Sequence, residues 1–432
     1  MRFAIATLGC KVNHYDSAII QDRLDTLGME QCEFDEVADV YVINTCTVTD
    51  RADSESLKLA RRARRLNPGA RILMTGCLAQ ANPELLASSP QVDRVIGLAR
   101  LDDLGRAAMG EAGERVMVSN LRKQKVEIEL APAPLAGQTR AFLKLQEGCN
   151  QFCTFCVIPF SRGSSRSVAP RRVMEALDEL HDRGFKEVIL TGVHLGGYGK
   201  DLNPEVSLED LLEMIAERCP IERVRISSID PEEMSDRVLD IVSQSGKFCP
   251  HFHLPLQAGD DQILSAMRRR YETVFYERLV NRILERIPEV AIGTDLIVGF
   301  PGEGRGHFER YFKFVEKLPL AYFHVFPYAV RTGTTAAKLG GRVSPAEITR
   351  RARAMRELGE HKRLAFVRQF RDTRLKVLLE EPAGVGSLKG YSRNYIRVFV
   401  EAPEHLINHE VDVESLATDG AALVAKLVRP AA

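Results

Sequence analysis

Three cysteines stand close together near the middle of the sequence, in the stretch EGCNQFCTFCVIPFSRG at residues 147–163. Cys149, Cys153 and Cys156 form a CxxxCxxC pattern, which places three thiolates on one tight loop. A zinc ion and a four-iron cluster both take four ligands, and a zinc site more often pairs CxxC with a second CxxC or with histidine. The spacing therefore favours an iron–sulfur cluster with one iron left open for a small molecule, with zinc binding as the alternative.

A second set of cysteines lies near the N-terminus. Cys10, Cys46 and Cys77 each follow a strand-like run, and these runs are RFAIATLG, ADVYVINT and RILMTG. Helical patterns between the runs predict a parallel, doubly wound sheet, in which ligands bind at the carboxyl ends of the strands. Because three cysteines at equivalent strand ends can converge on one point, the pattern predicts a second metal site.

The remaining elements predict two further domains, so the fold class is α/β with a small all-β module at the end. Six strand–helix units follow Ala141 and predict a partial (β/α)6 barrel, whose active site lies at the carboxyl ends of its strands. The first of these strands ends just before Cys149, so the CxxxCxxC pattern lies on the first strand–helix loop. After a basic helical stretch at 350–371, short alternating runs predict a small barrel of about five strands.

Composition is that of an ordinary globular protein, with 432 residues, 45% hydrophobic and 27% charged. No apolar run is long enough to cross a bilayer, and the apolar stretch at the N-terminus is too short for a signal peptide. We therefore expect a cytoplasmic protein without a membrane partner. The 59 basic and 59 acidic residues balance, which gives no global support for a nucleic-acid partner.

Both cysteine sets resemble a known family. CNQFCTFC is similar to the signature of radical S-adenosylmethionine enzymes, in which the open iron chelates the amino and carboxylate groups of S-adenosylmethionine. TLGCKVN, INTCTVT and TGCLAQ resemble the N-terminal domain of methylthiotransferases, and GYSRNYIRV resembles the TRAM domain, an RNA-binding barrel of OB-like form. The chain as a whole is thus similar to radical S-adenosylmethionine methylthiotransferases.

The resemblance implies two [4Fe-4S] clusters, one held by Cys10, Cys46 and Cys77 and one by Cys149, Cys153 and Cys156. In such enzymes one S-adenosylmethionine methylates a sulfur held on the first cluster. A second is cleaved at the other cluster to a 5′-deoxyadenosyl radical, which takes the hydrogen from an unreactive C2 of adenosine. No side chain is assigned as a catalytic acid or base, because the cofactors carry the hard step.

The motifs TLGCKVN, TGVHLGGYG and GYSRNYIRV are most similar to the bacterial type that acts on N6-threonylcarbamoyladenosine at position 37 of the tRNA anticodon loop. The type acting on isopentenyladenosine usually reads GCQMN at the first motif, and the type acting on a ribosomal-protein aspartate reads GCPKN. Both stay as alternative substrates. A non-catalytic iron–sulfur RNA-binding regulator is a further alternative. The implied partners are tRNA, an electron donor such as a flavodoxin or ferredoxin, and a sulfur source.

Four residues are candidates for contacts to S-adenosylmethionine. Phe155 occupies the aromatic position that the resemblance places beside the adenine. Gly192 allows close backbone approach, Gln257 can hydrogen-bond a polar group, and Asp295 is a polar residue inside an apolar strand-like run. His194 and the pair Ser227–Ser228 are weaker candidates.

The predicted boundaries give four segments. They are a methylthiotransferase N-terminal domain at 1–112, a linker at 113–138, a radical S-adenosylmethionine core at 139–366 and a TRAM domain at 367–432. From residue 371 onward the last segment is charge-balanced, whereas 350–371 holds eight Arg or Lys against two Glu. Since phosphate binding needs a basic face, we expect 350–371 to contribute to the RNA surface.

Overall fold

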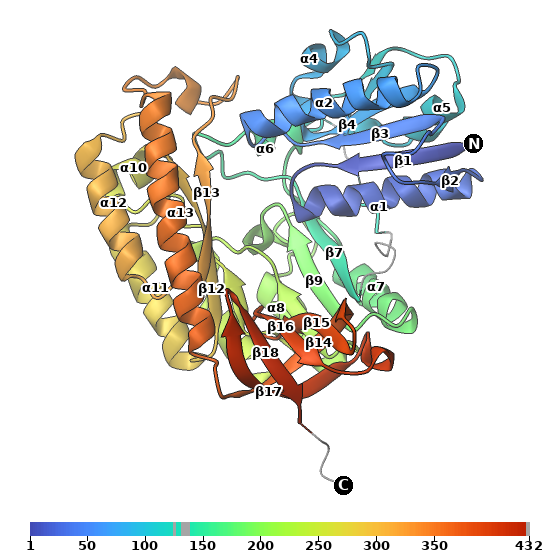
Figure 1. Cartoon of the computed structure of the whole chain (residues 1–432). Helices are drawn as coiled ribbons and strands as arrows, with labels where there is room; N and C mark the ends of the chain where they lie inside the picture. Colours follow the sequence, from blue (N-terminus) through green and yellow to red (C-terminus); the bar gives the residue numbers. More distant parts are fainter. Residues whose placement is uncertain (124–126, 131–138, 429–432) are drawn as a thin grey trace.

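The computed structural model describes residues 1–123, 127–130 and 139–428. They form an N-terminal α/β domain, a central α/β domain and a C-terminal β-barrel, which confirms the predicted fold class. Figure 1 shows the N-terminal domain in blue and the barrel in red, both packed against the central domain. Two parts of the expected linker, residues 124–126 and 131–138, lie outside the described residues.

The N-terminal domain is a six-stranded parallel sheet in the order β2-β1-β3-β4-β5-β6. Its strands are β1 (Arg2–Thr7), β2 (Glu30–Gln31), β3 (Val40–Thr45), β4 (Arg71–Gly76), β5 (Arg94–Ile96) and β6 (Val116–Met117). Its helices are α1 (Lys11–Thr26), α2 (Asp50–Leu66), α3 (Cys77–Ala81), α4 (Pro83–Ala87) and α5 (Asp103–Met109). Helices α1 and α5 cover one face through one apolar core, and α2 and α4 cover the other, which confirms the doubly wound sheet.

The sheet runs past the expected domain boundary at residue 112. Strand β6 pairs with β5 and lies inside the segment that we expected to be linker. Strand β6 has two residues and lies in an apolar run of only three, Val116 to Val118, which is too short to mark a strand in the sequence.

The central domain contains six parallel strands and their covering helices. The strands are β7 (Arg140–Glu147), β9 (Glu187–Gly192), β10 (Arg223–Ile226), β11 (His251–His253), β12 (Ala291–Val298) and β13 (Tyr322–Pro327). The helices are α6 (Ile158–Ser161), α7 (Pro170–Asp182), α8 (Leu208–Arg218), α9 (Asp236–Gln244), α10 (Asp261–Ala266), α11 (Thr273–Arg286) and α12 (Arg305–Lys317). A short strand β8 (Arg166–Ser167) pairs antiparallel with β7.

The six strands curve into a partial barrel. Strands β7, β9 and β10 form one hydrogen-bonded group, and β11, β12 and β13 form another. Isolated parallel bridges from Val224 to Phe248 and from Ser228 to His253 join the two groups. The predicted six units are therefore present. The sequence patterns did not indicate helix α11, because α10 and α11 both fall between the same two strands.

The C-terminal module is a closed five-stranded barrel in the order β14-β15-β16-β18-β17. Its strands are β14 (Arg374–Gly384), β15 (Ser387–Ser392), β16 (Arg397–Glu401), β17 (Glu410–Asp419) and β18 (Ala422–Leu427). The predicted basic helix before it is α13 (Pro345–Arg368), which packs on β13 and crosses the expected boundary at residue 367. The small all-β barrel is thus confirmed.

Buried arginines fix the barrel to the central domain. Glu187 on β9 accepts from Arg223 Nη2 and from Arg225 Nε, both at 2.8 Å. Arg225 Nη1 also donates to the backbone carbonyl of Arg393 in the barrel at 2.8 Å, and Arg393 pairs with Glu410 at 2.8 Å. Because breaking a buried ion pair is costly, these contacts hold the barrel in one orientation.

Among the described residues, no helix is both long enough and apolar enough to cross a bilayer.

Candidate active site

The N-terminal cysteines converge at one edge of the first sheet. Cys10 follows β1, Cys46 follows β3, and Cys77 opens α3 directly after β4. A Cβ atom added to Gly9, whose φ is +104°, would lie 2.8 Å from the Cβ of Cys46, so only glycine allows this approach. Burial raises the pKa of Cys77 to about 12, and the nearby Cys10 and Cys46 raise it as well.

The CxxxCxxC loop follows β7 and closes back on the segment after it. The amide of Cys149 donates to the carbonyl of Gly163 at 3.1 Å. At Gly148, with φ of +74°, an added Cβ would lie 2.1 Å from the Ser164 carbonyl oxygen, so the loop needs glycine at this point. Burial raises the pKa of Cys149 to about 11 and that of Cys156 to about 12, and the neighbouring cysteines add to both shifts.

The two cysteine sets open on one cavity of about 1370 Å³. All three domains line it, from the start of α1 to the carboxyl ends of the central strands and the barrel. The predicted site residues that line it are Cys10, Cys46, Cys149, Cys153, Cys156, Phe155, Gly192, Gln257 and Asp295. Cys77 is buried behind this wall.

The thiols fit a multi-iron cluster better than a single zinc ion. Among the described residues, two groups of three ligand side chains bring their ligand atoms within 4.8 Å of one another, and neither group contains a cysteine. Two sulfurs on one zinc, each at about 2.3 Å, cannot lie farther apart than about 4.6 Å. The wider spacing and the three-thiol sets therefore fit [4Fe-4S] clusters with one iron free of protein ligands.

One arginine connects the two cysteine sets. Arg162, which is 1% exposed, follows the CxxxCxxC loop, and its Nε donates to Cys77 Sγ at 3.2 Å. Its Nη1 donates to Glu147 Oε1 at 2.7 Å, and its Nη2 donates to Asp16 Oδ2 at 2.9 Å and to the Asn13 side chain. The domain interface is therefore held at a point that directly contacts Cys77, one of the predicted cluster ligands.

Lys144 completes this buried network. Its ammonium lies 2.7 Å from Asp16 Oδ1 and 2.9 Å from Glu147 Oε2. Burial would raise the pKa of Glu147, but Arg162 and Lys144 lower it to about 2. The sequence patterns did not indicate Arg162, Lys144 or Asp16, since their partners come from distant segments of the chain.

A polar belt borders the CxxxCxxC loop on its other side. His194 Nε2 lies 2.9 Å from Glu233 Oε1 and 3.1 Å from Gln151 Nε2. Arg269 Nη2 lies 2.5 Å from Asp230 Oδ1, and its Nη1 lies 3.6 Å from Cys153 Sγ. Oε2 of Glu233 is buried and has no hydrogen-bond partner among the described residues, so this belt can accept a ligand's donor group.

The four predicted S-adenosylmethionine contacts lie around the same cavity, and their role stays a prediction. Gln257 has φ of +68°, and its backbone N–H donates to the backbone carbonyl of Asp295 at 2.9 Å. The Asp295 carboxylate lies 3.0 Å from His253 Nε2. Gly192 ends β9 beside Gln146, and Phe155 packs at the edge of the central core. Backbone strain such as that at Gln257 is typical of functional positions.

Aromatic side chains form the wall nearest the barrel. The His251 and Tyr322 rings stack with centroids 5.9 Å apart. The ring centroid of the barrel residue Tyr395 lies 4.8 Å from that of His251. A Cβ on Gly293 would lie 2.2 Å from the Tyr322 ring, so this glycine leaves room for the ring. Lys11 lines the same wall, and burial together with the charges of Arg225 and Arg140 lowers its pKa to about 8.

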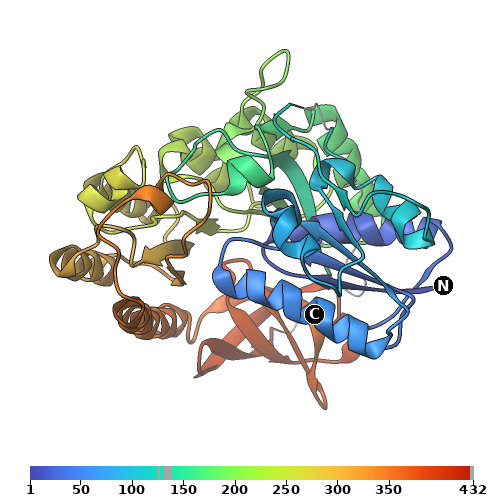
Figure 2. The ribbon, with the colours of Figure 1, turned by 90° about the horizontal axis from the view of Figure 1, so that it is seen from above.

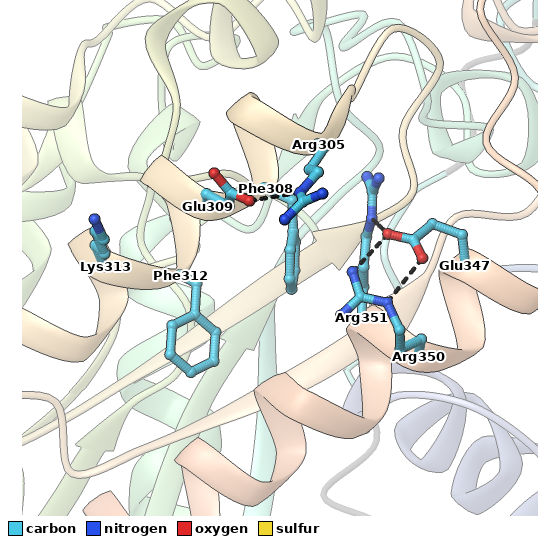
Figure 3. A pocket seen from close by; sticks show the side chains of 8 residues that line it. All are labelled: Arg305, Phe308, Glu309, Phe312, Lys313, Glu347, Arg350 and Arg351. Carbon is cyan, nitrogen blue, oxygen red and sulfur yellow. Dashed lines mark hydrogen bonds and ion pairs between the residues drawn. The ribbon is translucent and has the colours of Figure 1, made fainter.

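A second hollow lies between α12 and α13 and has a different character (Figure 3). Figure 3 shows Arg350 and Arg351 both directed at Glu347, with Phe308 beside them. Arg351 also pairs with Glu303 at 2.6 Å. Two of the basic residues expected to face RNA at 350–371 are thus neutralised within the protein. Arg363, farther along α13, is exposed and lines the main cavity.

Two family profiles match separate parts of the chain. One, described as "Uncharacterized protein family UPF0004", matches residues 2–97 and so covers the N-terminal cysteines. The other, the radical SAM superfamily, matches residues 143–315 and covers the CxxxCxxC loop and most of the partial barrel.

Solved structures with a similar fold include the radical S-adenosylmethionine methyltransferase TsrM from Kitasatospora setae, with a TM-score of 0.58 and 13% identity. That match covers 78% of this chain and 76% of TsrM. The cobalamin-dependent S-adenosylmethionine radical enzyme OxsB gives a TM-score of 0.52 at 12% identity, covering 83% of this chain and 56% of OxsB. At these identities the likeness shows the fold alone.

Curated relatives match over nearly the whole chain. The threonylcarbamoyladenosine tRNA methylthiotransferase MtaB of Bacillus subtilis is 37% identical, covering 96% of this chain and 93% of its own. The MtaB of Aquifex aeolicus is 38% identical, covering 88% of this chain and 93% of its own. A tRNA-2-methylthio-N(6)-dimethylallyladenosine synthase of Staphylococcus aureus is 32% identical, covering 95% of this chain and 82% of its own. The chain therefore belongs to the family of radical S-adenosylmethionine tRNA methylthiotransferases.

Proposed function

We propose that the protein is a tRNA methylthiotransferase that converts N6-threonylcarbamoyladenosine at position 37 of the anticodon loop to its 2-methylthio derivative. It uses two S-adenosylmethionine molecules per turnover and two [4Fe-4S] clusters. The MtaB relatives of Bacillus subtilis and Aquifex aeolicus, whose names give this substrate, have higher identity to the chain than the dimethylallyladenosine synthase of Staphylococcus aureus.

One observation carries the proposal. Cysteines of both sets, from different domains, line one cavity, and aromatic side chains of the central domain and the barrel line it as well. A base from a single-stranded RNA loop can be splayed out and stacked on such a wall. A transfer between two cofactors and a base needs all three groups in one chamber, and the cavity of about 1370 Å³ offers that arrangement.

The chain's own residues position and enclose the reactants. Cys10, Cys46 and Cys77 would hold one cluster, and Cys149, Cys153 and Cys156 the other. Together with bound S-adenosylmethionine, the clusters supply the one-electron chemistry needed to functionalise an unactivated aromatic carbon. Around them, Arg162 fixes the two domains against each other, and Phe155, Gly192, Gln257 and Asp295 would contact S-adenosylmethionine.

The proposed setting is the cytoplasm, where tRNA, an electron donor such as a flavodoxin or ferredoxin, and a sulfur source would be the partners. Arg363 and neighbouring basic residues of α13 would meet the RNA backbone at the cavity mouth.

Nucleoside analysis of tRNA by mass spectrometry tests this function. Deleting the gene should remove 2-methylthio-N6-threonylcarbamoyladenosine and leave its unmethylthiolated precursor, and complementation should restore it. Loss of the 2-methylthio-isopentenyl nucleoside instead would assign the substrate of the Staphylococcus aureus relative. Unchanged tRNA together with loss of a methylthio group on a ribosomal protein would reject tRNA as the substrate.

A further inference from the structure

Lys11 places a positive charge on the cavity wall between the N-terminal cysteines and the barrel. It is the first residue of α1, directly after Cys10, and its partly buried side chain lines the cavity. Among the described residues, its ammonium group has neither an ion pair nor a hydrogen bond, and only charges at a distance act on it. A partly buried ammonium group without a partner on a cavity wall can form a charge-assisted hydrogen bond with an anion that enters the cavity, so its position favours an anionic ligand.

The guanidinium groups that act on Lys11 electrostatically are already committed. Arg225 pairs with Glu187 at 2.8 Å, and Arg140 pairs with Glu380 at 2.6 Å. Asp295 is the acidic side chain that lines this part of the cavity, and His253 holds it at 3.0 Å. Glu187 and Asp295 act on Lys11 only from a distance and are paired with Arg225 and His253, so the ammonium group stays available to a ligand.

The surroundings of Lys11 suit a purine that carries an acidic substituent. The rings of Tyr391 and Tyr395 stack with centroids 5.1 Å apart, and His251 lies against Tyr395. All three side chains line the cavity together with Lys11. Aromatic faces bind bases by stacking, and an ammonium group beside them can bind a carboxylate on the base's side chain.

We propose that Lys11 binds the carboxylate of the threonylcarbamoyl group and thereby selects this nucleoside over adenosines whose N6 substituent is uncharged. The inference rests on the proposed function and names a residue that determines substrate choice. Lys11 acts on the substituent and takes no part in the reaction at C2.

Two anticodon stem-loop RNAs test the proposal, one with N6-threonylcarbamoyladenosine and one in which the threonyl carboxylate is a carboxamide. Wild-type holoenzyme, handled anaerobically, should bind the carboxamide RNA about 10- to 100-fold more weakly, the effect of losing a charge-assisted hydrogen bond. Lys11→Gln should bind both RNAs alike, at the level of the wild type with the carboxamide. Lys11→Arg keeps the charge and should keep most of the discrimination.

The matched control is Lys317→Gln, which removes an exposed lysine that pairs with Glu277 on the outer helices. It should discriminate as the wild type does. Iron and sulfide contents of each variant, and its Kd for S-adenosylmethionine, show whether the neighbouring Cys10 site is intact. Both should be unchanged in Lys11→Gln.

Two results would overturn the proposal. The wild type would bind both RNAs equally, or Lys11→Gln would keep the wild-type ratio of affinities for the two RNAs. The first result needs no variant, so the proposal can be tested even if Lys11→Gln does not fold. Failure of the proposed function is distinct, since the wild type would then form no methylthio product from the carboxylate RNA at any concentration.

Discussion

The guanidinium Nε of Arg162 lies 3.2 Å from the Sγ of Cys77, although 85 residues separate them in the chain. Arg162 belongs to the loop segment that follows one cysteine set, and Cys77 belongs to the other. The same guanidinium is held by Asp16 and Glu147, so its position is fixed from both domains. The two halves of the site are therefore joined by a buried ionic contact.

Removing this contact should destabilise the whole protein. Arg162→Met leaves Asp16 and Glu147 with Lys144 as their only cation in the network, and breaking a buried pair costs about 3–5 kcal/mol. We expect a fall of that size in the free energy of unfolding, measured by urea denaturation. Arg172→Met removes an exposed arginine, 63% accessible and paired with Glu175, and should cost less than about 1 kcal/mol. Equal effects of the two variants would contradict the structural role of Arg162.

The two cysteine sets should fail at different steps. Cys149→Ala should abolish reductive cleavage of S-adenosylmethionine, measured as 5′-deoxyadenosine. Cys46→Ala should keep that cleavage and lose methylthiolation of tRNA, measured by nucleoside mass spectrometry. Cys219→Ala, which alters a buried cysteine outside both sets, should do neither. If Cys149→Ala and Cys46→Ala lose only the same step, the division of labour between the sets is wrong.

Cluster assembly should depend on pH. In the metal-free protein the pKa of Cys149 is raised to about 11 and that of Cys156 to about 12, so both thiols are protonated at neutral pH. Metal binding needs thiolates, and a raised thiol pKa means that higher pH favours binding. We expect the apparent affinity for ferrous iron to rise at least about tenfold per pH unit between pH 7 and 9. A pH-independent affinity would show that these thiols are not the ligands.

The contribution of the Gln257 side chain to binding can be tested without changing the backbone conformation at this position. Because its φ is +68°, Gln257→Gly removes the amide side chain without the strain that alanine would bring. The variant should be as stable as the wild type and should bind S-adenosylmethionine about 2- to 10-fold more weakly, the range for a lost neutral hydrogen bond. Isothermal titration measures the affinity. An unchanged Kd would remove Gln257 from the predicted contacts.

The attachment of the barrel should weaken in acid. Burial would raise the pKa of Glu187, but Arg225 and Arg223 lower it to about 2 from an ordinary value of 4.5. A lowered carboxyl pKa stabilises the folded state above about pH 4.5, and this stabilisation, about 3 kcal/mol, is lost as the pH falls to about 2. Glu187→Gln should therefore be less stable than the wild type at pH 7.

The difference between wild type and Glu187→Gln should shrink as the pH falls, because the wild-type carboxylate is then neutralised too. Urea unfolding of the metal-free protein from pH 7 to 2.5 measures it. Glu357→Gln, on the exposed face of α13, serves as the control and should show a small difference that does not vary with pH. A difference for Glu187→Gln that stays constant would exclude this ionic attachment.

The six cysteines could be predicted from the sequence because their evidence is local. Cys149, Cys153 and Cys156 share one short motif, and Cys10, Cys46 and Cys77 each end a recognisable strand. Arg162 could not be predicted in this way, since its partner Asp16 lies 146 residues away and no local pattern joins them.

Lys11 shows what sequence motifs leave out. It is one of two positions, Lys11 and Val12, at which TLGCKVN departs from the GCQMN motif usual for the isopentenyladenosine type. Its lack of a partner emerges only in the structure, where Glu187 and Glu380 take up the charges of Arg225 and Arg140. Helix α11 and strand β6 were missed because one shares an interval with α10 and the other has only two residues.

The docking of the barrel through Arg223, Arg225 and Arg393 has a consequence for protein engineering. Tyr391 and Tyr395 of the barrel line the same cavity as the cysteines, so the barrel cannot be exchanged as if it only bound RNA. A chimera that carries a foreign RNA-binding module would bind other RNAs and would lose the aromatic surface that we propose for stacking the target base.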